Sequence, residues 1–243
     1  MTTILLGIDG TGAFLDRAYH REMNGSFVAY ILRHSKAKLK KYIRGPWAEG
    51  LDMAALVKTG HTFVHLSLAA NKDARILLTG YSRGGSGVIG IAQRLKAENV
   101  KVHGMILFDP VDRAIGVDTA VIPSNVERVV YARRDPNGMS RLSFGNTGTS
   151  WRAPTKVEMR SFLGTHGAIG GCHWKCPPDR KPTDLIEEPF EREGTRVNYQ
   201  QDLAAAQAVW TWVKPRVSAL GYLEIRGPRH TSDVDIRNKR PHS

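Results

Sequence analysis

Short runs of apolar and β-branched residues alternate along the chain with longer segments of helical periodicity. The apolar runs predict strands over residues 4–8, 75–80, 102–108, 127–132 and 157–163, with a weaker candidate over 40–45. The helical pattern predicts helices over residues 26–39, 50–70, 84–98 and 202–219. Strands that alternate with helices are typical of βαβ units, so the pattern predicts an α/β fold with a mostly parallel sheet and helices on both faces.

The length of 243 residues suits one domain, which we expect over residues 1–225. Residues 226–243 are polar and basic without apolar periodicity, and they predict a disordered tail. The segment 172–200 is rich in proline and charged residues and indicates an irregular excursion.

Composition excludes several classes of protein. A hydrophobic share of 41% excludes wholesale disorder, and no stretch reaches the roughly 18 consecutive apolar residues of a transmembrane helix. The first residues do not resemble a secretory signal, so we expect synthesis in the cytoplasm, with non-classical export left open. Two cysteines cannot form a disulfide framework, and a reducing compartment is the expectation.

Lysine and arginine outnumber aspartate and glutamate by 35 to 23, which gives a net charge of +12. Such a charge favours polyanionic partners, either an anionic membrane surface or nucleic acid. Basic residues gather at 36–44 and in the tail, but no zinc-finger spacing or RNA-recognition signature accompanies them. The sequence therefore does not favour nucleic acid, and it gives no indication of oligomeric state.

One strand–turn–helix segment carries a serine motif. After the strand predicted at 75–80 the chain reads Gly-Tyr-Ser-Arg-Gly over residues 80–84, and a helix rich in small residues follows. This order is typical of a nucleophile elbow, in which a tight turn lifts the serine hydroxyl out of the sheet. The helix N-terminus below the serine favours developing negative charge. We expect Ser82 to be a catalytic nucleophile; the alternative is a glycine-rich turn that holds phosphate.

A nucleophilic serine needs a histidine as base and a carboxylate that orients this histidine. In α/β enzymes of this type the acid and then the histidine follow the serine, each after a strand. His166 follows the predicted strand 157–163 in a glycine-flanked loop, and His173 is its close competitor. Asp109 and Asp135 each follow a predicted strand, so both are candidates for the acid.

An oxyanion hole needs two backbone N–H groups, one from the residue after the nucleophile and one from an early loop. Arg83 supplies the first, and the loop over residues 7–12 is the source predicted for the second, at Thr11. A rival interpretation makes the same loop a phosphate-binding loop of a phosphotransferase. The segment Cys172-His173-x-x-Cys176 suggests a metal site, but one short segment cannot close a tetrahedral site, so we expect no metal.

Four segments together resemble an uncharacterised family of α/β-hydrolase domains that includes phospholipase effectors of type VI secretion systems; they are residues 9–11, 80–85, 108–110 and 164–171. The family typically shows an early Asp-Gly-Thr, a G-x-S-R-G elbow and a Gly-x-His loop followed by glycines. The resemblance extends over residues 4–222. A second similarity, to chlorophyllases and lipases, links an elbow of this kind with a strand ending in Asp-Pro-Val-Asp, which favours Asp109 as the acid.

These resemblances imply an α/β-hydrolase-type serine esterase that acts on a lipid or phospholipid ester through an acyl-enzyme. Ser82, His166 and Asp109 would form its catalytic triad, and no cofactor would be needed. The expected partners are the ester substrate and an anionic membrane surface. The main alternative is a non-catalytic binding module on the same scaffold, associated with nucleic acid through its charge.

Overall fold

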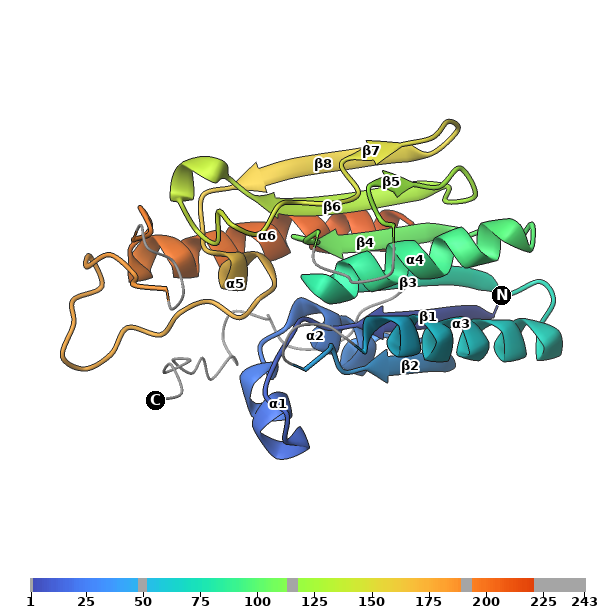
Figure 1. Ribbon diagram of the computed structural model, residues 1–243, viewed down its shortest axis with the longest axis horizontal. Helices are drawn as coiled ribbons and strands as arrows, with labels where there is room; N and C mark the ends of the chain where they lie inside the picture. The colour runs from blue at the N-terminus through green and yellow to red at the C-terminus, as the bar shows by residue number, and fades with distance from the viewer. Residues whose placement is uncertain (1, 48–51, 113–117, 189–193, 221–243) are drawn as a thin grey trace.

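The computed structural model describes residues 2–47, 52–112, 118–188 and 194–220 (Figure 1). Its centre is a six-stranded sheet in the order β2-β1-β3-β4-β6-β8, in which all neighbouring strands run parallel. The strands are β1 (Thr3–Ile8), β2 (Leu39–Ile43), β3 (Arg75–Tyr81), β4 (Gly104–Phe108), β6 (Arg128–Arg134) and β8 (Lys156–Phe162). The predicted fold class, an α/β fold built on a mostly parallel sheet with helices on both faces, is confirmed.

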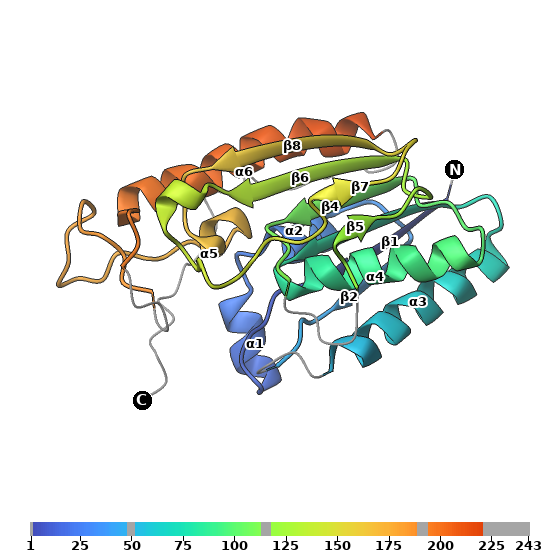
Figure 2. The ribbon, with the colours of Figure 1, turned by 45° about the horizontal axis from the view of Figure 1, so that its top comes forward.

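Helices cover both faces of this sheet, as Figures 1 and 2 show. The long helices α3 (Met53–Ala70) and α4 (Arg83–Ala97) pack on one face, and α2 (Phe27–His34) and α6 (Tyr199–Ala219) pack on the other. The short helices α1 (Asp16–Glu22) and α5 (His166–Ile169) lie at the edge where the strands end. Loops from several strands therefore meet at this edge, where parallel α/β sheets hold their sites.

The alternation of side chains along β1 explains the two cores. Ile4, Leu6 and Ile8 point into the core formed with α3 and α4, whereas Leu5 points into the core formed with α2 and α6. All four side chains are fully buried. Because successive side chains of a strand point to opposite faces, a central strand covered on both faces must be apolar at every position.

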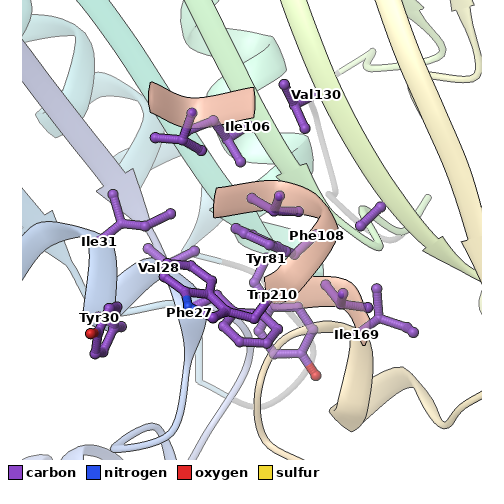
Figure 3. Packing of buried hydrophobic residues seen from close by; sticks show 14 of the residues in the cluster. Phe27, Val28, Tyr30, Ile31, Tyr81, Ile106, Phe108, Val130, Ile169 and Trp210 are labelled. Atoms are coloured by element: carbon purple, nitrogen blue, oxygen red, sulfur yellow. The ribbon is translucent and has the colours of Figure 1, made fainter. Parts of the chain in front are cut away.

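An aromatic cluster joins α2 and α6 over the sheet (Figure 3). The rings of Phe27 and Trp210 stack with centroids 5.3 Å apart, and Tyr30 meets the same indole edge-on at 5.0 Å. Phe108, at the end of β4, lies 5.2 Å from Phe27. The indole thus fastens α6 to α2 close to the ends of the central strands.

Sequence patterns missed the shortest elements. These are α1, α5, a 3₁₀ turn (Pro136–Gly138) and a small parallel pair of strands, β5 (Val121–Ile122) and β7 (Ser150–Trp151). These elements are too short to show a hydrophobic periodicity in the sequence. The helix predicted over 26–39 ends at His34, because Ser35 is extended and leads into β2.

The tail predicted at 226–243 lies outside the described residues. None of the described helices combines the length and the hydropathy that crossing a membrane requires.

Replacing Trp210 by alanine should lower the free energy of unfolding by about 3–5 kcal/mol, because the indole is buried between two aromatic rings and its loss leaves a cavity. Trp151→Ala is the matched control, since Trp151 is 45% exposed and should change stability by about 0.5 kcal/mol at most. Urea denaturation of both variants measures the difference. Equal losses would show that Trp210 does not hold the helices together.

Candidate active site

The turn between β3 and α4 holds Ser82 in a backbone conformation that few residues adopt, with φ 56° and ψ −130°. Glycines make this turn sterically feasible. A Cβ atom at Gly84 would lie 2.3 Å from the carbonyl oxygens of Ile8 and Asp9, and one at Gly80 would lie 2.5 Å from the carbonyl oxygen of Gly84. The two glycines of the motif are therefore required by close backbone approach on either side of Ser82.

A continuous chain of hydrogen bonds joins the three side chains that the sequence singled out. The Nε2 atom of His166 lies 2.8 Å from the Oγ atom of Ser82, and its Nδ1 atom lies 2.6 Å from the Oδ2 atom of Asp109. All three residues are buried. In the neutral tautomer that fits both contacts, Nδ1–H donates to the carboxylate and Nε2 accepts from the hydroxyl. This arrangement allows a hydroxyl to pass its proton to an imidazole.

The carboxylate of Asp109 is completely enclosed and receives donors from two further residues. Its Oδ1 atom accepts from the backbone N–H of Arg134 at 3.0 Å and from the side-chain amide of Asn146 at 2.8 Å. The guanidinium of Arg134 forms an ion pair with Oδ2. Asp109 itself has φ 44°, a left-handed conformation that aspartate tolerates better than most residues.

These contacts set the charges of the pair. Burial by itself raises the pKa of Asp109, but the hydrogen bond from His166 and the charge of Arg134 outweigh burial and hold this pKa well below its usual range. Burial lowers the pKa of His166; the hydrogen bond to Asp109 opposes this effect and the charge of Arg134 adds to it. The site therefore holds an ionised carboxylate beside a neutral imidazole near pH 7.

Helix α6 positions the histidine loop through a second buried carboxylate. Asp202, in the first turn of α6, accepts from the backbone N–H groups of Thr165 at 2.7 Å and Trp174 at 2.8 Å. Burial raises the pKa of Asp202 to about 6. Because these two amides lie on either side of α5, the helix holds both ends of the segment that carries His166.

Further contacts fix the backbone of His166 from the sheet side. Its N–H donates to the Oγ atom of Ser140 at 2.8 Å, and that hydroxyl donates to the buried carboxylate of Glu188 at 2.7 Å. The carbonyl oxygen of His166 accepts from the phenol of Tyr81 at 3.2 Å. The backbone of His166 is thus held at its N–H by Ser140 and at its carbonyl oxygen by Tyr81 of β3.

The loop after β1 lies against the turn that carries Ser82. A Cβ atom on Gly10 would lie 3.3 Å from the Cβ atom of Ser82, so the two backbones are adjacent. The carboxylate of Asp9 shapes the loop by accepting from the N–H of Gly10 at 2.9 Å and from the phenol of Tyr42 at 2.9 Å. The guanidinium of Arg83 donates to the Oγ1 atom of Thr11 at 3.2 Å. Thr11 and Arg83, both predicted from the sequence, therefore meet at this edge.

The competing candidates lie elsewhere. The half-buried carboxylate of Asp135 accepts from the N–H of Asn137 at 2.9 Å and begins the 3₁₀ turn. His173 is buried without a hydrogen-bond partner for its Nδ1 atom, and burial lowers its pKa to about 4. Cys172 and Cys176 do not form a disulfide with each other, and the residues that the structure describes contain no group of three or more His, Cys, Asp or Glu side chains fit for a metal.

Several supporting residues gave no signal in the sequence. Arg134 stands next to Asp135 at the end of a predicted strand, and only its position at that end could have suggested a role. The other members of the support lie in loops or at helix starts without a motif; they are Ser140, Asn146, Glu188 and Asp202. Their contacts with the site depend on how distant loops meet.

No protein-family model matches the chain, and no curated protein matches it. An uncharacterized protein from Pseudomonas aeruginosa is 16% identical over 70% of this chain and 41% of its own length, with a TM-score of 0.41. The Tle1 effector, solved bound to the VgrG spike of the type 6 secretion system, is 12% identical over 97% of this chain and 76% of its own, with a TM-score of 0.45.

A cutinase-like protein from Cryptococcus sp. is 19% identical over 90% of this chain and 95% of its own length, with a TM-score of 0.39. All three similarities are distant. The roles of the site residues therefore follow from the geometry of this chain alone.

The imidazole of His166 should titrate below its ordinary pKa of about 6.5, because burial disfavours the imidazolium. Asp109→Asn should lower this pKa further, since the carboxylate is the group that stabilises the charged ring. Nuclear magnetic resonance of the ring protons against pH measures both values. A pKa above 6.5 in the wild type, or a rise in the variant, would contradict this account of the pair.

Proposed function

We propose that the chain is a serine hydrolase that cleaves a carboxylic ester through an acyl-enzyme, with Ser82 as nucleophile, His166 as general base and acid, and Asp109 as the residue that orients the imidazole. One observation carries the proposal. The hydroxyl, the imidazole and the carboxylate form an unbroken hydrogen-bonded chain, with contacts of 2.8 Å and 2.6 Å, at the end of a tight strand–helix turn.

In the acylation step, the Oγ atom of Ser82 attacks the ester carbonyl carbon while its proton moves to the Nε2 atom of His166. The carboxylate of Asp109 stabilises the imidazolium that forms, and the carbonyl oxygen becomes an oxyanion. As the tetrahedral intermediate collapses, the ester C–O bond breaks and the imidazolium gives its proton to the departing alcohol. Water then repeats the sequence on the acyl-enzyme, which releases the acid and restores Ser82.

The oxyanion requires donors on the side of Ser82 away from the imidazole. We assign this role to the backbone N–H of Arg83, which opens α4, and to that of Thr11, in the loop beside the nucleophile turn. The positive end of the α4 dipole adds to their effect, because Arg83 is the first residue of that helix. The contact between the Arg83 and Thr11 side chains supports this assignment, since it keeps the two backbones together.

The substrate class that we propose is a lipid or phospholipid ester. Its support is the net charge of +12, which favours approach to an anionic surface, and the exposure of Phe14 and Leu15, large apolar side chains that follow the loop lying against the nucleophile turn.

Ser82→Ala should remove nearly all esterase activity, on the order of 10⁴-fold or more, while leaving the fold intact, because the triad acts as a unit and the hydroxyl makes no structural bridge. Turnover of a soluble p-nitrophenyl ester and labelling by a fluorophosphonate measure the loss. Thermal unfolding serves as the control for folding. Undiminished turnover in the purified variant would overturn the hydrolase proposal.

Asp109→Asn should cost roughly 10⁴-fold in turnover, because an amide favours the wrong imidazole tautomer. It should also lower the free energy of unfolding by about 3–5 kcal/mol, since Arg134 loses its buried counter-charge. Turnover is therefore compared per folded molecule. Asp135→Asn is the matched control, because the carboxamide oxygen can still accept from the N–H of Asn137 and begin the 3₁₀ turn. If the control lost more activity than Asp109→Asn, the orienting role would belong to Asp135.

A further inference from the structure

Three large apolar side chains are exposed together just beyond the loop that follows β1. Phe14 is 68% exposed, Leu15 is 69% exposed and Trp47 is 45% exposed. The rings of Phe14 and Trp47 meet edge to face, with centroids 5.3 Å apart. Single exposed apolar residues are common on protein surfaces, but an apolar group of this kind marks an interaction surface.

The backbone that displays these side chains is well held. The guanidinium of Arg44 donates to the carbonyl oxygen of Phe14 at 3.1 Å and to that of Ala13 at 2.6 Å. A parallel bridge pairs Gly12 with Trp47. The apolar side chains are therefore presented on an ordered backbone, so little conformational entropy is lost when they enter an apolar medium.

Basic side chains flank the apolar group on α1. Tyr19 points inward and is fully buried, and Arg17 and Arg21 are exposed. Each arginine is two residues from Tyr19, which places it about 160° around the helix from the buried side. Helix α1 stands away from the sheet in both ribbon views (Figures 1 and 2), so its outer face is presented to the surroundings.

The charge of this part of the chain is one-sided. Residues 14–47 contain eight lysines and arginines against two acidic residues, which accounts for half of the net charge of +12. Four of these lysines, at 36, 38, 40 and 41, lie on or just before β2, the strand at the edge of the sheet. Such a concentration of positive charge is attracted to a surface of anionic lipid headgroups.

We propose that the surface formed by Phe14, Leu15, Trp47, Arg17 and Arg21, the docking patch, inserts its apolar side chains into an anionic lipid surface. Phe14, in this patch, follows Thr11 by three residues along the chain. The hydroxyl of Thr11 contacts Arg83, the neighbour of Ser82. Docking would bring the site to the interface where lipid esters are found. In this respect the inference rests on the proposed function. It identifies the part of the protein surface that contacts the lipid.

A lipid surface fits the patch better than a protein partner does. A stable protein interface takes about 20–30 residues from each side, whereas the patch presents three apolar side chains. Membrane interfaces, in contrast, are entered by a few aromatic and aliphatic side chains with basic residues around them. The composition of the patch matches this second pattern.

Sedimentation with vesicles tests the proposal. The full chain carrying Ser82→Ala avoids hydrolysis and should bind vesicles of phosphatidylcholine mixed with phosphatidylglycerol more tightly than vesicles of phosphatidylcholine alone. Adding Phe14→Ser and Leu15→Ser should weaken binding by about tenfold or more, because the two apolar side chains that would insert into the lipid are lost. Serine is a favoured residue at the N-cap that Leu15 occupies, so α1 should be retained.

Arg17→Gln with Arg21→Gln should weaken binding to the anionic vesicles alone, and added salt should reduce the difference between this variant and its parent. Leu66→Ser with Leu185→Ser is the matched control, since these leucines are 65% and 55% exposed outside the patch. Urea denaturation confirms that each variant is folded. Equal vesicle binding by the Phe14/Leu15 variant and the leucine control would overturn the proposal, and so would equal binding of the parent chain to anionic and neutral vesicles. Retention of the chain by nucleic acid without binding to vesicles would also overturn it.

The docking proposal and the proposed function fail separately. Turnover of a soluble ester by the wild type needs Ser82 but no lipid surface. Soluble turnover should stay intact when Phe14→Ser and Leu15→Ser are made in the chain that keeps Ser82. Together with weaker vesicle binding by the same pair in the Ser82→Ala chain, this is the result expected of docking. Vesicle binding without any turnover of soluble or lipid esters by the wild type would sink the hydrolase proposal and leave the docking patch standing.

Discussion

A carboxylate removed from water needs hydrogen-bond donors and a compensating charge, and Asp109 obtains them from three separate parts of the chain. Arg134 comes from the end of β6, Asn146 from the loop after it, and His166 from the loop after β8. The buried charge therefore draws the ends of neighbouring strands together. The same contacts orient the imidazole, which burial keeps neutral, so the stability of this edge of the sheet and the chemistry proposed for it share one set of interactions.

The rest of the fold limits how the two reacting side chains can move. Ser82 is fixed by a turn packed so closely against the end of β1 that the carbonyl oxygens of Ile8 and Asp9 occupy the space a side chain at Gly84 would need. His166 is fixed by bonds to its backbone from Tyr81 and Ser140, and by Asp202 through the neighbouring Thr165. Two helices on opposite faces of the sheet, α4 and α6, thus determine the distance between hydroxyl and imidazole.

The docking patch is connected to the proposed catalytic site through the loop after β1. The loop after β1 carries the proposed oxyanion donor Thr11, and the exposed ring of Phe14 follows three residues later. Tyr19 ties the two regions together, because its phenol donates to the carbonyl oxygen of Gly10 at 2.9 Å while its ring supports the guanidinium of Arg44. A surface that holds Phe14 is consequently linked to the backbone beside Ser82 through one buried side chain.

Local patterns in the sequence determined the order of strands and long helices, because periodicity and apolar runs express which faces are buried. They also indicated the nucleophile turn, since the Gly-x-Ser-x-Gly pattern over residues 80–84 lies between a predicted strand and a predicted helix. Gly80 is required by a close approach within the turn, to Gly84, whereas Gly84 is required by the distant carbonyl oxygens of Ile8 and Asp9. His166 could be selected from its place after a strand, whereas Asp109 and Asp135 remained alternatives on the residues alone, because both follow strands that end at the same edge.

Only the tertiary structure distinguished their surroundings, since the carboxylate of Asp109 lies 2.6 Å from the imidazole and that of Asp135 begins a 3₁₀ turn instead. The supporting contacts of Arg134, Asn146, Ser140, Glu188 and Asp202 were equally invisible in the sequence. Each joins residues that are distant along the chain, and a single sequence carries no local signal for which loops meet. Contacts between residues that are close along the chain could be predicted from the sequence. Contacts between residues from different strands and loops were decided by the packing of the sheet.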